Sequence, residues 1–194
     1  MSLTPVAKGQ VAAIVTHLEM RERPMPAPIP PAPLRLAPWK EPGLDAYRTL
    51  FRRIGTPWLW FSRLVMDDAA LAAIIHDPAV SIYAVTDPRG VEVGLLELDF
   101  RSLPDCELAF LGLIPGLNGK GFGQWLMMQA KALAWRKDVE RLWVHTCTLD
   151  SPAALGFYQK HGFRPFAREV EIFADPRLAG ILPRDAAPQV PLLD

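Results

Sequence analysis

The chain has 194 residues, of which 50% are hydrophobic and 22% are charged, so it can fold around one full hydrophobic core. Its 21 basic and 21 acidic side chains cancel, which leaves no bulk charge to draw the protein onto nucleic acid or an anionic membrane. We therefore expect neither as a partner, and any polyanionic ligand must be held locally.

The two cysteines, Cys106 and Cys147, stand in apolar stretches without the close Cys or His spacing of a zinc site. The apolar run at 11–15 is too short to cross a bilayer, and no cleavage site follows a basic leader. We expect a protein without a metal, in the reducing environment of the cytoplasm.

The first part of the chain is predicted to be a strand followed by a stiff connector. Apolar side chains alternate with His17 and Glu19 along residues 10–20, the pattern of a half-buried strand. From Pro24 to Pro42 so many prolines follow that neither a helix nor a central strand can form. The inner face of the strand is predicted to carry Ala12, Ile14, Thr16, Leu18 and Met20.

Two helices and a hairpin are predicted next, after a short strand at 34–37. Apolar side chains recur at steps of three and four in both helical segments, and Asp67 or Asp68 can cap the second. The turn at 87–90 has the residue types that join two antiparallel strands. The predicted helices cover 44–54 and 67–75, and the hairpin strands cover 81–86 and 91–100.

The second half of the chain alternates between strands and helices. A strand ends at Pro115, a glycine-rich loop follows, and the next helix is apolar on most of its faces. Ser151 and Pro152 are expected to open the last helix as cap and first-turn proline, and Gly162 to close it. This order predicts an α/β sheet with helices on its faces. The expected elements are strands at 106–114 and 141–148, a helix at 121–137, a strand pair around 163–173 and an irregular tail beyond 176.

The glycine-rich loop is the strongest chemical signal. Gly119, Gly121 and Gly123 let the backbone turn tightly with its amides inward, where they can donate to phosphate oxygens beside a helix N-terminus. The loop contains neither the Gly-Lys-Ser/Thr of a nucleotide-binding P-loop nor the dinucleotide fingerprint. A pyrophosphate site and a plain structural turn are the two interpretations of the loop alone.

The loop and a later motif together resemble the Gcn5-related N-acetyltransferase (GNAT) family. Asn118-Gly-Lys-Gly-Phe-Gly123 follows a strand, and Ala154-Leu-Gly-Phe-Tyr158 with Gly162-Phe163 comes some thirty residues later, in the family's order. Two positions depart from the family pattern: Asn118 stands where Arg or Gln is favoured, and Ser151 stands where Asn is favoured.

The resemblance implies a fold and a division of the chain. It implies a single mixed, mostly antiparallel sheet of six to seven strands with helices on both faces. Residues 34–176 would form the acyl-CoA N-acyltransferase domain. Residues 1–33 would be an N-terminal strand and proline-rich connector, and 177–194 an irregular tail. The N-terminal segment could dock on the sheet edge of a second copy, so a homodimer is one arrangement we consider.

The resemblance also implies a binding site for acetyl-CoA, the acyl donor. The pantetheine arm would lie between splayed strands near Leu111 and Leu113, with the N–H of Leu111 donating to the thioester oxygen. Ser151 would hold the pantetheine or cap the helix behind it. The diphosphate would be held by Asn118, Gly119, Lys120, Gly121, Phe122 and Gly123.

Two catalytic residues follow from the same resemblance. Tyr158 matches the family's phenol, which protonates the leaving thiolate, and Glu107 matches the glutamate that serves as base. His145 and a water chain are the alternatives for the base. A further cluster is expected to line the acceptor pocket, where its single cation would suit a substrate carboxylate. It consists of Trp58, Trp60, Phe61 and Arg63.

The sequence therefore predicts an N-acetyltransferase for the amine of a small molecule or amino acid derivative. The alternatives are a protein or peptide N-acetyltransferase and a coenzyme A-binding module without catalysis.

Overall fold

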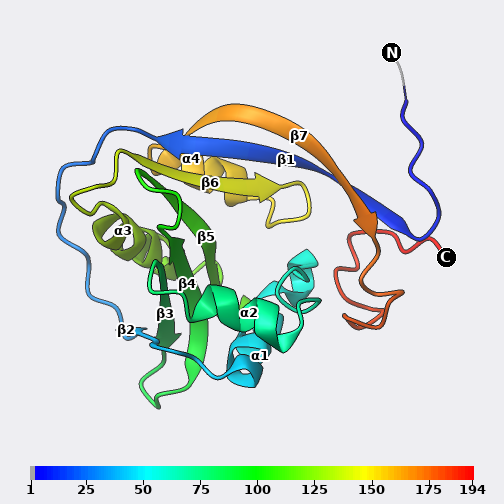
Figure 1. Ribbon diagram of the computed structural model, residues 1–194, viewed down its shortest axis with the longest axis horizontal. Helices are drawn as coiled ribbons and strands as arrows, with labels where there is room; N and C mark the ends of the chain where they lie inside the picture. Colours follow the sequence, from blue (N-terminus) through cyan, green and yellow to red (C-terminus); the bar gives the residue numbers. More distant parts are fainter. Residues whose placement is uncertain (1–2) are drawn as a thin grey trace.

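The computed structural model describes residues 3–194 and contains one seven-stranded sheet (Figure 1). The strands are β1 (Gln10–Met20), β2 (Arg35–Pro38), β3 (Val80–Thr86), β4 (Glu92–Asp99), β5 (Asp105–Leu113), β6 (Arg141–Cys147) and β7 (Arg164–Ala174). The helices are α1 (Leu44–Gly55), η1 (Thr56–Trp58), α2 (Asp68–Ile75), η2 (Pro115–Leu117), α3 (Phe122–Ala134) and α4 (Ala154–Lys160). In this part of the chain no helix combines the length and the apolar character needed to cross a membrane.

The strands are hydrogen-bonded in the order β2-β3-β4-β5-β6-β1-β7. All neighbours are antiparallel except β5 and β6, which run parallel. The predicted mixed, mostly antiparallel sheet is confirmed, with seven strands.

The helices cover both faces of the sheet, as predicted, because β4 buries its two faces against different helices. Leu95 packs into a core with α1 and α2. Its neighbours Leu96 and Leu98 pack into a separate core with α3 and α4. Asp67 caps α2 by accepting a hydrogen bond from the Ala70 N–H, at 2.8 Å, so that sequence prediction is also confirmed.

The N-terminal strand β1 has a position that the sequence analysis does not foresee. It lies inside the sheet, between β6 and β7, and pairs antiparallel with both (Figure 1). The strand predicted within residues 1–33 is therefore an integral part of the sheet of its own chain and not an arm outside it.

The predicted inner face of β1 is only half correct, because the buried face changes between Val15 and Thr16. In the second half Leu18 and Met20 are buried against α3, α4 and β6, as predicted. In the first half Val11 and Ala13 are buried against the C-terminal segment, while Ile14 is 45% exposed. The C-terminal segment covers one face of the first half of β1, and α3 and α4 cover the other face of its second half. A single alternating pattern of apolar residues predicts only one buried face for the whole strand.

Three other predictions at the C-terminal side need correction. A single strand, β7, replaces the expected strand pair, because it pairs with β1 along almost its whole length. Ser151 is not the cap of α4: the helix begins at Ala154, and the Ser151 carbonyl accepts the Ala154 N–H at 2.8 Å. Helix α3 ends at Ala134, since Trp135 leaves the helical conformation.

The tail after β7 has no regular secondary structure, as predicted, yet it is tightly packed. Arg177 is buried in an ion pair with Asp175, at 2.7 Å. The Arg177 guanidinium also donates to carbonyls of the tail, including those of Ala186 and Val190. The tail packs its side chains against Leu59, in the loop after η1.

Candidate active site

The strands β5 and β6 separate after a short parallel pairing. They are paired only between 105–107 and 141–143. The register between β4 and β5 shifts by one residue, because Glu97 faces Phe110 while Leu98 faces Leu108, which leaves Ala109 as a bulge. A bulge bends its strand, so it accounts in part for the divergence of β5 from β6.

A cavity of about 610 Å³ lies where the two strands have separated. This volume is in the range that binds small molecules and cofactors. Of the predicted site residues, the cavity is lined by Glu107, Leu111, Leu113, Asn118, Gly119, Gly123, Ser151 and Tyr158. Three predicted residues, Lys120, Gly121 and Phe122, do not line it.

The glycine loop joins the cavity to the N-terminus of α3. Gly119 and Gly121 have φ angles of 75° and 82°, a backbone conformation that favours glycine. A Cβ added at either position would meet no atom within 4 Å, so the loop borders open space. No side chain caps α3, whose first backbone amides therefore stay available for an anion. These residues fit a bound diphosphate.

Tyr158 comes to the cavity from α4. Its ring packs edge-on against Phe157 and Phe163, at centroid distances of 5.7 and 5.8 Å. Burial raises the pKa of the Tyr158 phenol, and the negative charge of Asp150 raises it further. The phenol therefore keeps its proton at neutral pH and can act as a proton donor.

Glu107 and His145, the two candidate bases, lie side by side on β5 and β6. The Glu107 Oε1 and His145 Nδ1 atoms are 3.3 Å apart. The Glu107 carboxylate, as acceptor and as negative charge, raises the pKa of His145 above its ordinary value, although burial opposes this. The structure thus brings both candidates together as one carboxylate–imidazole pair.

The sequence analysis does not single out Asp150, which organises the turn after β6. Its carboxylate accepts hydrogen bonds from Thr146 Oγ1 at 2.7 Å, from the Cys147 N–H at 2.9 Å and from Trp60 Nε1 at 3.1 Å. The hydrogen bond from Trp60 links the loop after η1 to the turn after β6. The only sequence signal is an acidic residue between a strand end and Ser151-Pro152.

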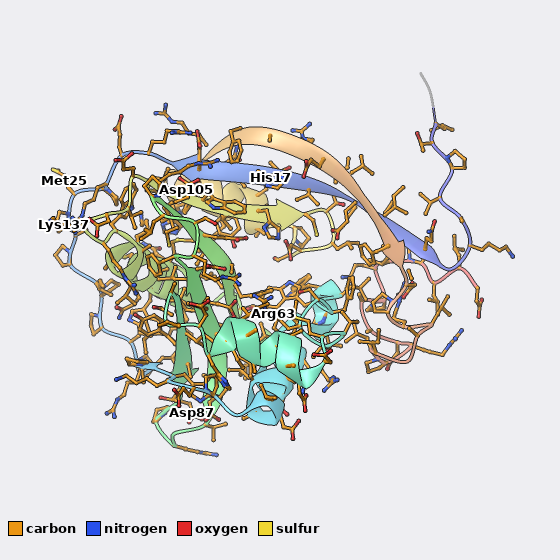
Figure 2. The ribbon with its side chains drawn as sticks, viewed as in Figure 1. His17, Met25, Arg63, Asp87, Asp105 and Lys137 are labelled. Carbon is orange, nitrogen blue, oxygen red and sulfur yellow. The ribbon has the colours of Figure 1, made fainter. Side chains whose placement is uncertain are left out.

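The predicted aromatic cluster, Trp58, Trp60 and Phe61 with Arg63, does line the cavity. Figure 2 labels Arg63, which is not a free cation. Its Nη2 atom donates to Glu97 Oε1 at 2.6 Å, and Glu97 is fully buried. The Tyr47 hydroxyl donates to the other oxygen of the same carboxylate. The interpretation of Arg63 as a partner for a substrate carboxylate is therefore wrong.

Comparison with known proteins agrees with this geometry. The model of the acetyltransferase (GNAT) family matches residues 33–163, which is well over half of the chain. No protein with a curated description matches the sequence.

Solved structures share the fold at low identity. A GCN5-related N-acetyltransferase from Sphaerobacter thermophilus has a TM-score of 0.62 and 17% identity, over 88% of this chain and 52% of that one. A second GCN5-related N-acetyltransferase, from Kribbella flavida, has a TM-score of 0.51 and 16% identity, over 89% of this chain and 63% of that one. An IAA acetyltransferase from Bacillus cereus has a TM-score of 0.53 and 21% identity, over 69% of this chain and 79% of that one. The chain thus spans about half of the Sphaerobacter protein.

The mixed sheet split between two parallel strands, with the glycine loop beside the split, has the fold of these acetyltransferase structures. The chain belongs to the GNAT family of acetyltransferases. The acyl donor of this family is acetyl-CoA.

Proposed function

We propose that this protein is an N-acetyltransferase that moves an acetyl or short acyl group from coenzyme A to the amine of a small molecule, by direct attack. One observation carries the proposal. A single cavity at the split between β5 and β6 is lined by the glycine loop, the phenol of Tyr158 and the Glu107–His145 pair.

The donor would be held by the backbone of this chain. The amides between Asn118 and Gly123, with the N-terminus of α3, would bind the diphosphate. The pantetheine would lie along Leu111 and Leu113 and beside Ser151, all of which line the cavity. When bound, the donor supplies a thioester carbonyl that an amine can attack.

In the remaining steps, side chains of this chain transfer protons and one backbone N–H stabilises the thioester oxygen. The Glu107–His145 pair would take a proton from the ammonium form of the acceptor, and the neutral amine would then attack the thioester carbon to form the C–N bond. The Leu111 N–H would donate to the thioester oxygen. As the C–S bond breaks, Tyr158 would give its proton to the sulfur, which leaves as a thiol.

Thiol release tests the proposal directly. The protein is incubated with acetyl-CoA and either small primary amines or peptides, and free coenzyme A is measured. We expect turnover with a small amine. Turnover with peptides alone would make the protein a peptide N-acetyltransferase, and binding of acetyl-CoA without any turnover would make it a binding module.

The compartment and the oligomeric state stay predictions. Cys106 and Cys147 are both free thiols, which supports a reducing compartment such as the cytoplasm. The homodimer can be checked by light scattering of the purified chain.

A further inference from the structure

The acceptor side of the cavity contains two cations, and both are neutralised by the protein itself. Arg63 is paired with the buried Glu97. Arg101 is paired with Asp99, with its Nη2 and Nε atoms 2.5 and 2.9 Å from the carboxylate. Among residues 3–194 the Nε–H of Arg63 has no hydrogen-bond partner, but it is fully buried and cannot reach a ligand. Arg63 is therefore not available to bind a substrate carboxylate, and the charge of Arg101 is balanced by Asp99.

Three carboxylates of the same cavity lack such a partner. Glu107, Asp150 and Glu171 all line it, and none forms an ion pair with an arginine or lysine in the described part of the chain. Glu107 pairs with His145, and Glu171 lies on the exposed strand β7, so Asp150 and Glu171 are the two lining carboxylates without a basic partner among the described residues. Beside the main contribution of Glu107, the charges of Asp150 and Glu171 also raise the pKa of His145. The acceptor side therefore favours a positively charged group and disfavours a negative one.

The rest of this side is aromatic. Phe61 and Phe173 face each other at a centroid distance of 4.8 Å, and Trp60 and Phe110 at 5.2 Å. The bond from Trp60 Nε1 to Asp150 fixes the indole in place. The rings of each pair are tilted, by 34° and 59°, so they offer apolar ring faces that can also bind a cation.

We infer that the acceptor is a cationic arylalkylamine: a primary amine on a flat apolar body, without a carboxylate of its own. The inference rests on the proposed function and names its acceptor class. The ammonium group would be drawn to Asp150 and Glu171, which pair with no basic side chain of the described residues, and the ring would pack on the aromatic wall. The Glu107–His145 pair would then remove the proton that the amine must lose before attack.

Matched ligand pairs test this inference. Phenethylamine is compared with phenylalanine, and tryptamine with tryptophan, since each pair differs only by the carboxylate. Each ligand is titrated into coenzyme A-saturated protein by calorimetry, and its turnover with acetyl-CoA is measured by thiol release. We expect each amine to exceed its amino acid by at least about tenfold in affinity and in kcat/KM. Putrescine, a cation without a ring, is expected to bind more weakly than phenethylamine.

Substitutions on β7 supply the control. Glu171→Gln removes a carboxylate of the cavity and should lower the amine-to-amino-acid ratio about threefold. Glu169→Gln removes the same charge two residues away, where the carboxylate pairs with His17 outside the cavity, and should leave the ratio unchanged.

The two readouts separate the inference from the proposed function. Equal or better binding of the amino acids, stronger binding of putrescine, or no binding of any ligand overturns the inference. Selective binding of the arylalkylamines without acetyl transfer supports the inference and counts against the transferase.

Discussion

At the scale of single residues, the cavity holds two groups whose proton affinities suit opposite tasks. Burial raises the pKa of Tyr158, so the phenol is present in its protonated form, as a donor must be. The neighbouring Glu107 strengthens His145 as an acceptor of protons. The roles of these two groups can each be tested by a single substitution.

The phenol of Tyr158 can be tested by removing its hydroxyl alone. In Tyr158→Phe the ring keeps its packing against Phe157 and Phe163, so the fold and the affinity for acetyl-CoA should be retained. We expect kcat to fall by about 100-fold, the usual contribution of a general acid. Tyr83→Phe, a tyrosine of β3 that does not line the cavity, is the control. Unchanged turnover in Tyr158→Phe would exclude the acid role.

The pH dependence tests the Glu107–His145 pair. Because Glu107 raises the pKa of His145, kcat/KM should rise with pH through a midpoint above 6.5, the ordinary value for histidine. Glu107→Gln removes the charge that holds the proton, so the midpoint should move to lower pH. Glu169→Gln should leave it in place, because its carboxylate contacts His17 and not His145. A midpoint that does not move in Glu107→Gln would show that another group titrates.

At the scale of secondary structure, the proposed binding of the donor depends on the join between η2 and α3. Gly121→Glu should cost about 1–2 kcal/mol, because a side chain is strained at a φ of 82°. It should also abolish binding of coenzyme A, because a carboxylate at the helix N-terminus repels the diphosphate.

The hairpin turn offers a matched control for that substitution. Gly90 has a φ of 84°, and a Cβ added there would also meet open space, but this glycine lies in the turn after β3. Gly90→Glu should lose similar stability in thermal unfolding and keep its affinity in calorimetry. Equal affinity in both variants would remove the loop from the binding site.

How well each element could be predicted depended on whether its signal is local. The helical periodicity of 44–54 and the turn chemistry of 87–90 are local, so α1 and the β3–β4 hairpin were predicted to within a residue or two. The insertion of β1 depends on partners in and after β6, as in the bond from the Ile14 N–H to Thr148 Oγ1 across 134 positions. The family motifs indicated Tyr158 and Glu107 because they too are local, whereas the pairing of Arg63 with Glu97 joins segments whose contact no spacing reveals.

At the scale of the whole molecule, the C-terminal tail supports the loop after η1, of which Leu59 lines the cavity. Arg177 ties the tail together, and the tail packs on Leu59 while Gln189 donates to the Pro57 carbonyl at 2.8 Å. Arg177→Ala should destabilise the protein by about 3–5 kcal/mol, because it leaves the buried Asp175 without its ionic partner. Denaturant unfolding measures this loss.

A second arginine of the tail is the control for that prediction. Arg184 forms an exposed pair with Asp194, and Arg184→Ala should cost less than about 1 kcal/mol. A similar loss of unfolding free energy in both variants would mean that the buried Arg177–Asp175 pair stabilises the protein no more than the exposed pair does.

The place of β1 also sets a limit on how the protein can be shortened. A fragment cut to residues 33–163 would keep every motif of the family match, yet it would lack both β1 and β7. The free edge of β6 would then face water, and Leu142 and Val144 would lose their β1 neighbours Met20 and Leu18. Such a fragment should form aggregates on expression, so the boundaries of the family match are not the boundaries of the folding unit.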